Sequence, residues 1–188
     1  MTTSIVYLLG SPGVGKRTVA EALAAMTGAA VIDNHKVNLP LMSLFRWDGR
    51  TQLPEEVWDY AATIRSAVLD ALADIAPRDA SYILTNTLEV GDTSWFERVE
   101  AIARAREAVF VPVRLVCDLD EQLRRVSRED RVVRLKLSDP VRARELIEGG
   151  DFFTPTGPTA LVLDTTHQSA DETAAIIAAR IRTLINDR

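Results

Sequence analysis

The sequence has a single cysteine, Cys117, among its 188 residues, which excludes an internal disulfide framework. One unpaired thiol fits a reducing compartment. The first residues carry no basic leader, and the apolar stretch there covers only residues 5–9. That stretch is too short for a signal peptide or a membrane span. We therefore expect a cytoplasmic protein with no membrane partner.

An excess of basic charge is also missing. The formal net charge is -5, although the chain carries 19 arginines against only three lysines. An acidic balance of this kind argues against a nucleic-acid partner, because such proteins normally present a basic face. Hydrophobic residues make up 47% of the chain, enough for one well-packed domain over residues 1–188. We expect a monomer or a homodimer.

Short apolar runs alternate with longer helical patterns along the chain. The runs that predict strands are residues 4–9, 29–33, 81–86, 109–117 and 159–164. They are almost continuously apolar, as expected for parallel strands that are covered on both faces. Pro112 lies inside the fourth run, so we expect that strand to be short or to begin after the proline.

Helices are predicted at residues 16–27, 54–75, 94–108, 119–128, 140–148 and 170–186. Gly28 follows the first of them as a C-terminal cap, and Asp139 precedes Pro140 as an N-terminal cap. The alternation of strand and helix predicts an α/β protein with a doubly wound parallel sheet. Residues 34–53 and 124–158 interrupt the alternation at the ends of strands, where open α/β sheets bind their ligands.

The stretch "LLGSPGVGKRT" directly follows the first predicted strand and opens the first helix. Gly10, Gly15 and Lys16 have the spacing of the phosphate-binding pattern G-x-x-x-x-G-K-[ST], but Arg17 occupies the slot whose hydroxyl usually contacts magnesium. Thr18 supplies a hydroxyl one position later. The alternative is a glycine-rich turn. Lys16 favours the phosphate loop, because a cation at the positive end of a helix needs an anion nearby.

The segment "GSPGVGKRT" resembles the loop of adenylate kinase and its relatives, the small P-loop kinases for nucleotides, shikimate, gluconate and antibiotics. In adenylate kinases too, a threonine comes one position after the usual hydroxyl slot. The resemblance implies a three-layer domain with helices on both faces of a five-stranded parallel sheet of order 2-3-1-4-5. It also implies a substrate-binding insertion at 34–60, a lid at 124–150 and a base-contacting loop at 164–167.

The same resemblance implies an ATP-dependent small-molecule kinase that moves the γ-phosphoryl group to a hydroxyl or phosphate acceptor. The cofactors are then ATP or GTP and Mg²⁺. The residues expected to hold the nucleotide in the loop are Gly10, Ser11, Pro12, Gly13, Val14, Gly15, Lys16, Arg17 and Thr18. Lys16 is also expected to act in catalysis.

Asp33 ends the second predicted strand in "VIDNH". Similar kinases carry an aspartate there, so we expect Asp33 to act as the base or, with Thr18, in the magnesium shell. The alternative is a strand-end aspartate that caps the next segment. The third strand, "SYILTNTLE", lacks the carboxylate that many P-loop proteins offer to the metal. A nucleotide-binding protein or slow NTPase without a small-molecule acceptor is therefore the alternative function.

The segment 124–134 is rich in arginine, which suits phosphate geometry. Its arginines are Arg124, Arg125, Arg128, Arg131 and Arg134. By resemblance we expect Arg128 and Arg131 to be catalytic, with Arg128 also contacting the nucleotide. The alternative is a solvated helix face, balanced by neighbouring acidic residues. Thr165 and Thr166 are expected near the base, or else in an N-cap turn of the last helix.

The insertion contains aromatic and charged residues that suit an acceptor pocket. We expect substrate contacts from His35, Phe45, Trp47 and Arg50. At helical spacing, apolar residues of this kind also suit a hydrophobic core. The insertion matches no substrate signature, so the acceptor has no predicted identity.

Overall fold

In the computed structural model, which describes residues 2–133 and 135–188, five strands form one parallel sheet. The strands are β1 (Ser4–Leu9), β2 (Ala30–Asp33), β3 (Tyr82–Asn86), β4 (Val109–Val116) and β5 (Leu161–Asp164). Their order is β2-β3-β1-β4-β5, and every neighbouring pair is parallel. The predicted sheet and its strand order are confirmed.

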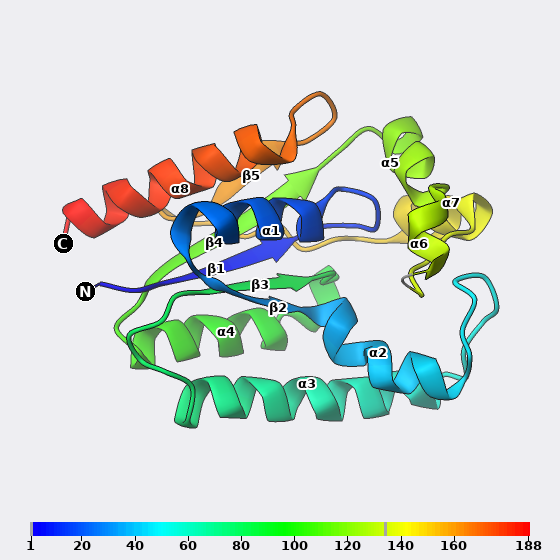
Figure 1. Cartoon of the computed structure of the whole chain (residues 1–188), viewed down its shortest axis with the longest axis horizontal. Helices are drawn as coiled ribbons and strands as arrows, with labels where there is room; N and C mark the ends of the chain where they lie inside the picture. Colours follow the sequence, from blue (N-terminus) through cyan, green and yellow to red (C-terminus); the bar gives the residue numbers. More distant parts are fainter. Residues whose placement is uncertain (1, 134) are drawn as a thin grey trace.

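Helices cover both faces of this sheet (Figure 1). On one face lie α1 (Lys16–Thr27) and α8 (Ala170–Asn186), and on the other lie α3 (Glu56–Asp74) and α4 (Ser94–Ala105). Each helix pair buries its own apolar core against the sheet. Because β1 is central, its side chains alternate between the two cores: Leu8 lies in one, and Leu9 in the other. The three-layer α/β class is confirmed.

Two of the predicted helix ends are built as expected. Gly28 adopts a left-handed conformation with φ of 73°, and its N–H donates to the carbonyl of Ala24. Asp139 caps α7 (Pro140–Gly149), because its side chain accepts hydrogen bonds from the backbone N–H of Val141 and of Arg142. The last helix, α8, begins with a capping box formed by Ser169 and Glu172.

The prediction missed several short elements. The helix α2 (Asn34–Leu44) lies in the apolar insertion, for which no helix was predicted, and it contains Pro40. A proline inside a helix normally argues against one. The other missed elements are η1 (Val90–Asp92) and α6 (Glu129–Val133), whereas the helix predicted at 119–128 is present as α5 (Leu119–Val126) and ends at Val126. Arg134 lies outside the described residues.

The expectation that Pro112 would shorten the fourth strand is wrong. β4 runs through it, and Pro112 lies opposite Tyr7 of β1. Alternate residues of a parallel strand direct their N–H groups to opposite neighbours. The N–H of Val109 donates to Thr3 on the β1 side, so the nitrogen of Pro112 faces the β5 side. β5 starts pairing only at Val113, so no sheet hydrogen bond is lost.

The strand tips point toward the end of the molecule where α2, α5, α6 and α7 gather, and both chain termini lie at the opposite end (Figure 1). The residues of the insertion and of the arginine-rich segment therefore meet the phosphate loop at one edge of the sheet. Within the described chain, the helices are all too short or too polar to cross a membrane.

Candidate functional site

The loop between β1 and α1 depends on glycine at two close approaches. Gly10 has φ of 150°, and a Cβ there would lie 2.7 Å from the carbonyl oxygen of Leu115. Gly13 has φ of 90°, and its Cβ would lie 2.9 Å from the carbonyl oxygen of Gln122. The loop is held on the same side by Ser11, whose hydroxyl donates to the Gln122 Oε1 atom at 2.6 Å. The backbone therefore packs directly on β4 and α5.

The loop ends at the N-terminus of α1 without a side-chain cap. Gly15 is the N-cap residue, with φ of 92°, and it has no side chain to accept from the first turn. The N–H groups of a first helical turn have no partner inside the helix. Together with the helix dipole, they form a site for an anion. No acidic residue lies in that first turn.

Lys16 folds back over this loop. Its Nζ atom donates to the carbonyls of Gly10 and Ser11, at 2.6 and 3.0 Å, and to the Thr87 hydroxyl at 3.1 Å. Burial lowers the pKa of Lys16 to about 7, and the positive charge of Lys136 adds to this, although the Asp33 carboxylate opposes it. A phosphate bound at the loop would favour the charged amine.

Asp33 uses its two carboxylate oxygens differently. It is 4% exposed, and its Oδ1 atom accepts from the N–H of His35 at 3.1 Å and from the Thr85 hydroxyl at 3.0 Å. This oxygen caps α2, which the alternative interpretation expected. Its Oδ2 atom is buried without a hydrogen-bond partner, 3.7 Å from Arg17 Nε. A buried acceptor left unpaired is costly, so this atom is ready to receive a donor.

Two more unpaired acceptors lie beside it on the first turns of α2. The Oδ1 atoms of Asn34 and of Asn38 are also buried without a hydrogen-bond partner among the described residues. Both side chains line the same cleft as Asp33. Three unpaired oxygens along one wall indicate a ligand that donates several hydrogen bonds, such as a compound with hydroxyl groups.

The cleft has a volume of about 770 Å³ and is far more basic than the chain as a whole. Its acidic lining consists of Asp33, Glu89 and Asp92. Its basic lining is larger and consists of Lys16, Arg17, Arg65, Arg125, Arg128, Arg131, Lys136 and Arg142. In a protein of net charge -5, eight basic side chains around one cleft indicate an anionic ligand.

The arginines of the predicted lid have distinct positions. Arg128 and Arg131 both line the cleft, and Arg131 Nε donates to the carbonyl of Leu137 at 2.9 Å. Arg125, which the sequence did not single out, lies close to the loop, since a Cβ on Gly15 would lie 3.8 Å from its Nη1 atom. It also donates to Thr165, at 3.2 Å to the hydroxyl and 2.7 Å to the carbonyl.

The insertion and the lid contact each other across the cleft. The N–H of Ser138 donates to the carbonyl of Gly49 at 3.0 Å, and the Arg142 guanidinium donates to the carbonyl of Arg50. Gly49 has φ of 78°, and a Cβ there would lie 2.2 Å from the Lys136 carbonyl oxygen. Only glycine permits this approach. A small apolar cluster lies close by, made of Met42, Leu53, Val57, Leu41, Trp47 and Leu135.

The four predicted substrate contacts divide into two pairs. His35 and Trp47 line the cleft, and Trp47 Nε1 donates to the carbonyl of Thr51 at 2.6 Å. Phe45 and Arg50 are exposed and do not line it among the described residues. Arg50 lies in a turn that the Asp48 side chain holds by accepting from the backbone N–H groups of Arg50 and Thr51.

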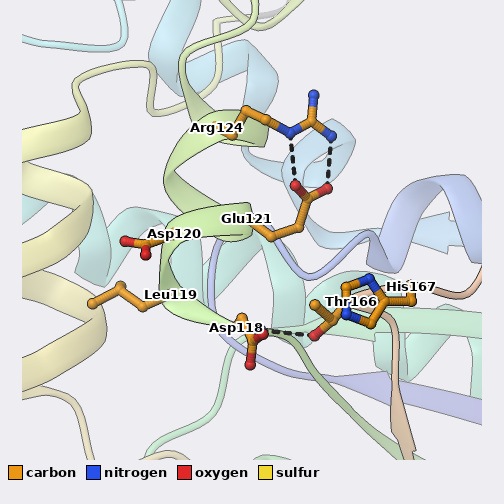
Figure 2. Close-up of a pocket in the computed structure, with 7 residues that line it drawn as sticks. All are labelled: Asp118, Leu119, Asp120, Glu121, Arg124, Thr166 and His167. Atoms are coloured by element: carbon orange, nitrogen blue, oxygen red, sulfur yellow. Dashed lines mark hydrogen bonds and ion pairs between the residues drawn. The ribbon is translucent and has the colours of Figure 1, made fainter.

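Thr165 and Thr166 are the first two residues of the loop after β5. The Thr165 hydroxyl donates to the carbonyl of Val14 at 2.9 Å, which ties this loop to the phosphate loop. Neither threonine caps α8, because Ser169 does. Thr166 lines a second, open pocket of about 670 Å³ between the start of α5 and this loop (Figure 2). There its hydroxyl donates to Asp164 and accepts from the Asp118 N–H.

The second pocket contains a tight ion pair. Glu121 and Arg124 lie face to face in Figure 2, with two hydrogen bonds of 2.6 and 2.7 Å. Hydrogen bonds from Arg124 and Arg125 lower the pKa of Glu121 to about 2. Arg124 is thus paired with an acidic residue of its own helix. For this arginine, the alternative of a solvated helix face balanced by acidic neighbours applies.

Residues of α3 and α4 complete the cleft, and no sequence pattern predicted them there. Arg65 lies 4.8 Å from the centroid of the Trp95 ring, and its Nε atom is buried without a partner. Burial lowers the pKa of Arg65 below its usual range. Trp58 also lines this wall. Along α3 these residues have the spacing of an ordinary amphipathic helix, so the sequence does not mark them as cleft residues. The packing of α3 against the sheet identifies them.

The donor set fits a directly bound Mg²⁺ poorly. The residues described by the structure contain no group of three or more His, Cys, Asp or Glu side chains that could hold a metal. A magnesium ion beside a nucleotide needs only one or two protein oxygens, because phosphates and waters supply its other ligands, so the fit depends on Thr18 and Asp33. Thr18, the expected partner of Asp33, is exposed. The unpaired oxygen of Asp33 faces the Arg17 guanidinium, and one cation beside this buried carboxylate disfavours a second cation there. We therefore assign no step to a metal ion.

Comparison with solved structures identifies the architecture. A candidate kinase from Chloroflexus aurantiacus superposes with a TM-score of 0.73 at 18% identity, over 97% of each chain. A gluconokinase from Sinorhizobium meliloti gives 0.67 at 18% identity, over 98% of this chain and 94% of that one. The chain has the P-loop small-molecule kinase fold.

A third structure with this fold is the shikimate kinase from Acinetobacter baumannii in complex with shikimate. It superposes with a TM-score of 0.57 at 20% identity, over all of this chain and 96% of that one. No family model and no curated protein matches the sequence. The P-loop kinase fold is therefore established by structure, and the activity rests on the site itself.

Proposed function

We propose that the chain is a small-molecule kinase that binds ATP or GTP at the loop from Gly10 to Thr18 and phosphorylates a hydroxyl group. The observation that carries this proposal is the unpaired Oδ2 atom of Asp33. It lies in the same cleft as Lys16 and the open N-terminus of α1. The phosphate site can bind the nucleotide that donates the phosphoryl group. The buried, unpaired carboxylate oxygen in the same cleft can receive the proton of the hydroxyl that accepts it.

The reaction assigns distinct tasks to the two sides of the cleft. Asp33 Oδ2 accepts the proton of the attacking hydroxyl, whose oxygen forms a bond to the γ-phosphorus. The bond from that phosphorus to the β–γ bridging oxygen breaks, and the nucleoside diphosphate leaves. Lys16, Arg128 and Arg131 stabilise the charge that develops on the transferring group and on the leaving oxygen.

The nucleotide base belongs beside the loop after β5 in this proposal. Thr165 hydrogen-bonds to the phosphate loop, and Thr166 and Arg124 line the open pocket next to it. The acceptor belongs on the other side, near His35, Trp47 and the buried oxygens of α2. Their unpaired acceptor atoms favour a compound with several hydroxyl groups.

A slow NTPase without a small-molecule acceptor is the second proposal, and Arg17 is the observation that favours it. Arg17 replaces the hydroxyl that usually contacts magnesium and lies near the carboxylate that would act as the base. A screen of sugars, polyols, hydroxy acids, nucleosides and aminoglycosides, with ADP release as the signal, separates the two. Turnover that needs an acceptor supports the kinase, whereas hydrolysis equal with and without every acceptor supports the NTPase.

A further inference from the structure

Arg17 lies at the phosphate site, and among the described residues most hydrogen-bond donors of its guanidinium have no acceptor. It is the second residue of α1, directly after Lys16, and it lines the cleft. Its Nε atom donates to Glu21 Oε1 at 2.7 Å, one turn further along the helix. Among the described residues, the hydrogen bonds to this guanidinium use only Nε. Its two terminal nitrogens therefore keep their donors for a ligand.

Two neighbours fix the direction of this side chain. Glu21 holds it from the helix, and Asp33 Oδ2 lies 3.7 Å from its Nε atom, across the cleft wall. The side chain is 23% exposed, so a bound phosphate would reach it without unfolding any element. A guanidinium matches the geometry of phosphate oxygens and remains charged throughout the working pH range.

The positive charge of Arg17 takes the place of the magnesium ion that this position of a phosphate loop normally helps to bind. A serine or threonine there contributes a hydroxyl to Mg²⁺, which neutralises the phosphates. Arg17 removes the hydroxyl and brings a positive charge on the protein itself. The end of β3 itself carries no carboxylate: the hydroxyls of Thr85 and Thr87 donate to Asp33 and to the Gly10 carbonyl, and the next acidic residue that lines the cleft along the chain is Glu89.

We propose that Arg17 binds a phosphate group of the nucleotide directly and supplies the positive charge that Mg²⁺ supplies in other phosphate loops, so that nucleotide binding needs no divalent ion. The inference rests on the proposed nucleotide site and adds to it the ionic form of the ligand. Free ATP⁴⁻, rather than only its magnesium complex, is then a ligand of this chain.

Calorimetric titration of the whole chain with ATP, in excess Mg²⁺ and in excess EDTA, tests the proposal. For the unaltered chain we expect dissociation constants within about threefold of each other. Arg17→Thr restores the hydroxyl and removes the charge, so its affinity in EDTA falls by about tenfold or more relative to Mg²⁺, the value of a charge-assisted hydrogen bond. The control is Arg104→Thr, which removes an exposed arginine of α4 that does not line the cleft and retains the ratio of the unaltered chain.

Each other outcome overturns a different statement. If the unaltered chain binds ATP more than about tenfold more weakly in EDTA, the inference is wrong while the nucleotide site stands. If Arg17→Thr binds ATP equally in both conditions, the independence from magnesium does not come from Arg17. If ATP binds in neither condition, the proposed function itself fails. Thermal unfolding of each variant checks that it is folded, and Arg17→Lys, which keeps the charge, provides a second variant.

Discussion

The phosphate-loop wall of the cleft comes from consecutive residues, whereas the wall opposite joins Arg50 to Arg142, 92 positions apart. On the first wall, glycine conformations and a helix N-terminus fix the geometry locally. On the second, the insertion and the lid depend on a few backbone contacts between distant segments. A substitution on the first wall should therefore alter the chemistry, and a substitution on the second wall should alter the closure of the cleft.

Asp33→Asn should have the largest effect. Asparagine keeps an oxygen to accept from His35 and Thr85, but it replaces the unpaired carboxylate oxygen with an amide nitrogen. We expect acceptor-dependent turnover to fall by about 10²–10⁴-fold, the range for a general base, with ATP affinity nearly unchanged. Steady-state kinetics with the acceptor found by screening, together with calorimetry, measure both.

Asp79→Asn is the matched control for this variant. Asp79 is exposed and follows α3, outside the cleft, so its turnover should equal that of the unaltered chain. Full turnover by Asp33→Asn would show that this carboxylate is not the base.

Lys16→Ala should act on the phosphate-loop wall by weakening nucleotide binding. The amine now donates to the carbonyls of Gly10 and Ser11, and a phosphate would compete for the same donors. Loss of a charge-assisted contact predicts about 10- to 100-fold weaker ATP binding by calorimetry. Lys36→Ala removes an exposed lysine of α2 that does not line the cleft and should bind normally. Equal affinity in both variants would refute the loop assignment.

Gly49→Ala should act on the opposite wall by separating the lid from the insertion. A Cβ at this position meets the Lys136 carbonyl at 2.2 Å on a backbone with φ of 78°. Strain of about 1–3 kcal/mol predicts roughly tenfold faster hydrogen exchange at the Ser138 N–H, which donates to Gly49. Gly91→Ala is the control, because nothing lies within 4 Å of its added Cβ. Unchanged protection of Ser138 would mean that the two segments do not depend on this contact.

The pH dependence of ATP binding should show the smallest effect. The pKa of Lys16 is lowered to about 7, and a bound phosphate raises it because it favours the charged amine. Affinity is then full below pH 7 and falls as pH rises, by roughly fivefold between pH 7 and pH 8. The comparison with Lys16→Ala removes the titration of the nucleotide itself. The same slope in both proteins would exclude Lys16 as its source.

The sequence was sufficient for the sheet, the phosphate loop and most helix boundaries, because these depend on local patterns. It was insufficient for α2, where Pro40 argues against a helix, yet the Asp33 cap and packing against α3 maintain one. It also favoured Arg128 and Arg131 over Arg125, since equally spaced arginines look alike until the chain folds. The roles of all these residues remain predictions, as does a single domain over residues 1–188.

By itself the sequence determined that a glycine-rich loop joins β1 to α1 and ends at Lys16, because φ angles and helix termini depend on neighbouring residues. It also determined that an arginine follows Lys16. Only the tertiary structure decided that this arginine lies 3.7 Å from Asp33 and that Arg65 and Trp95 share a cleft with it. Those distances come from separate strands and helices, which the sheet hydrogen bonds and side-chain packing bring together.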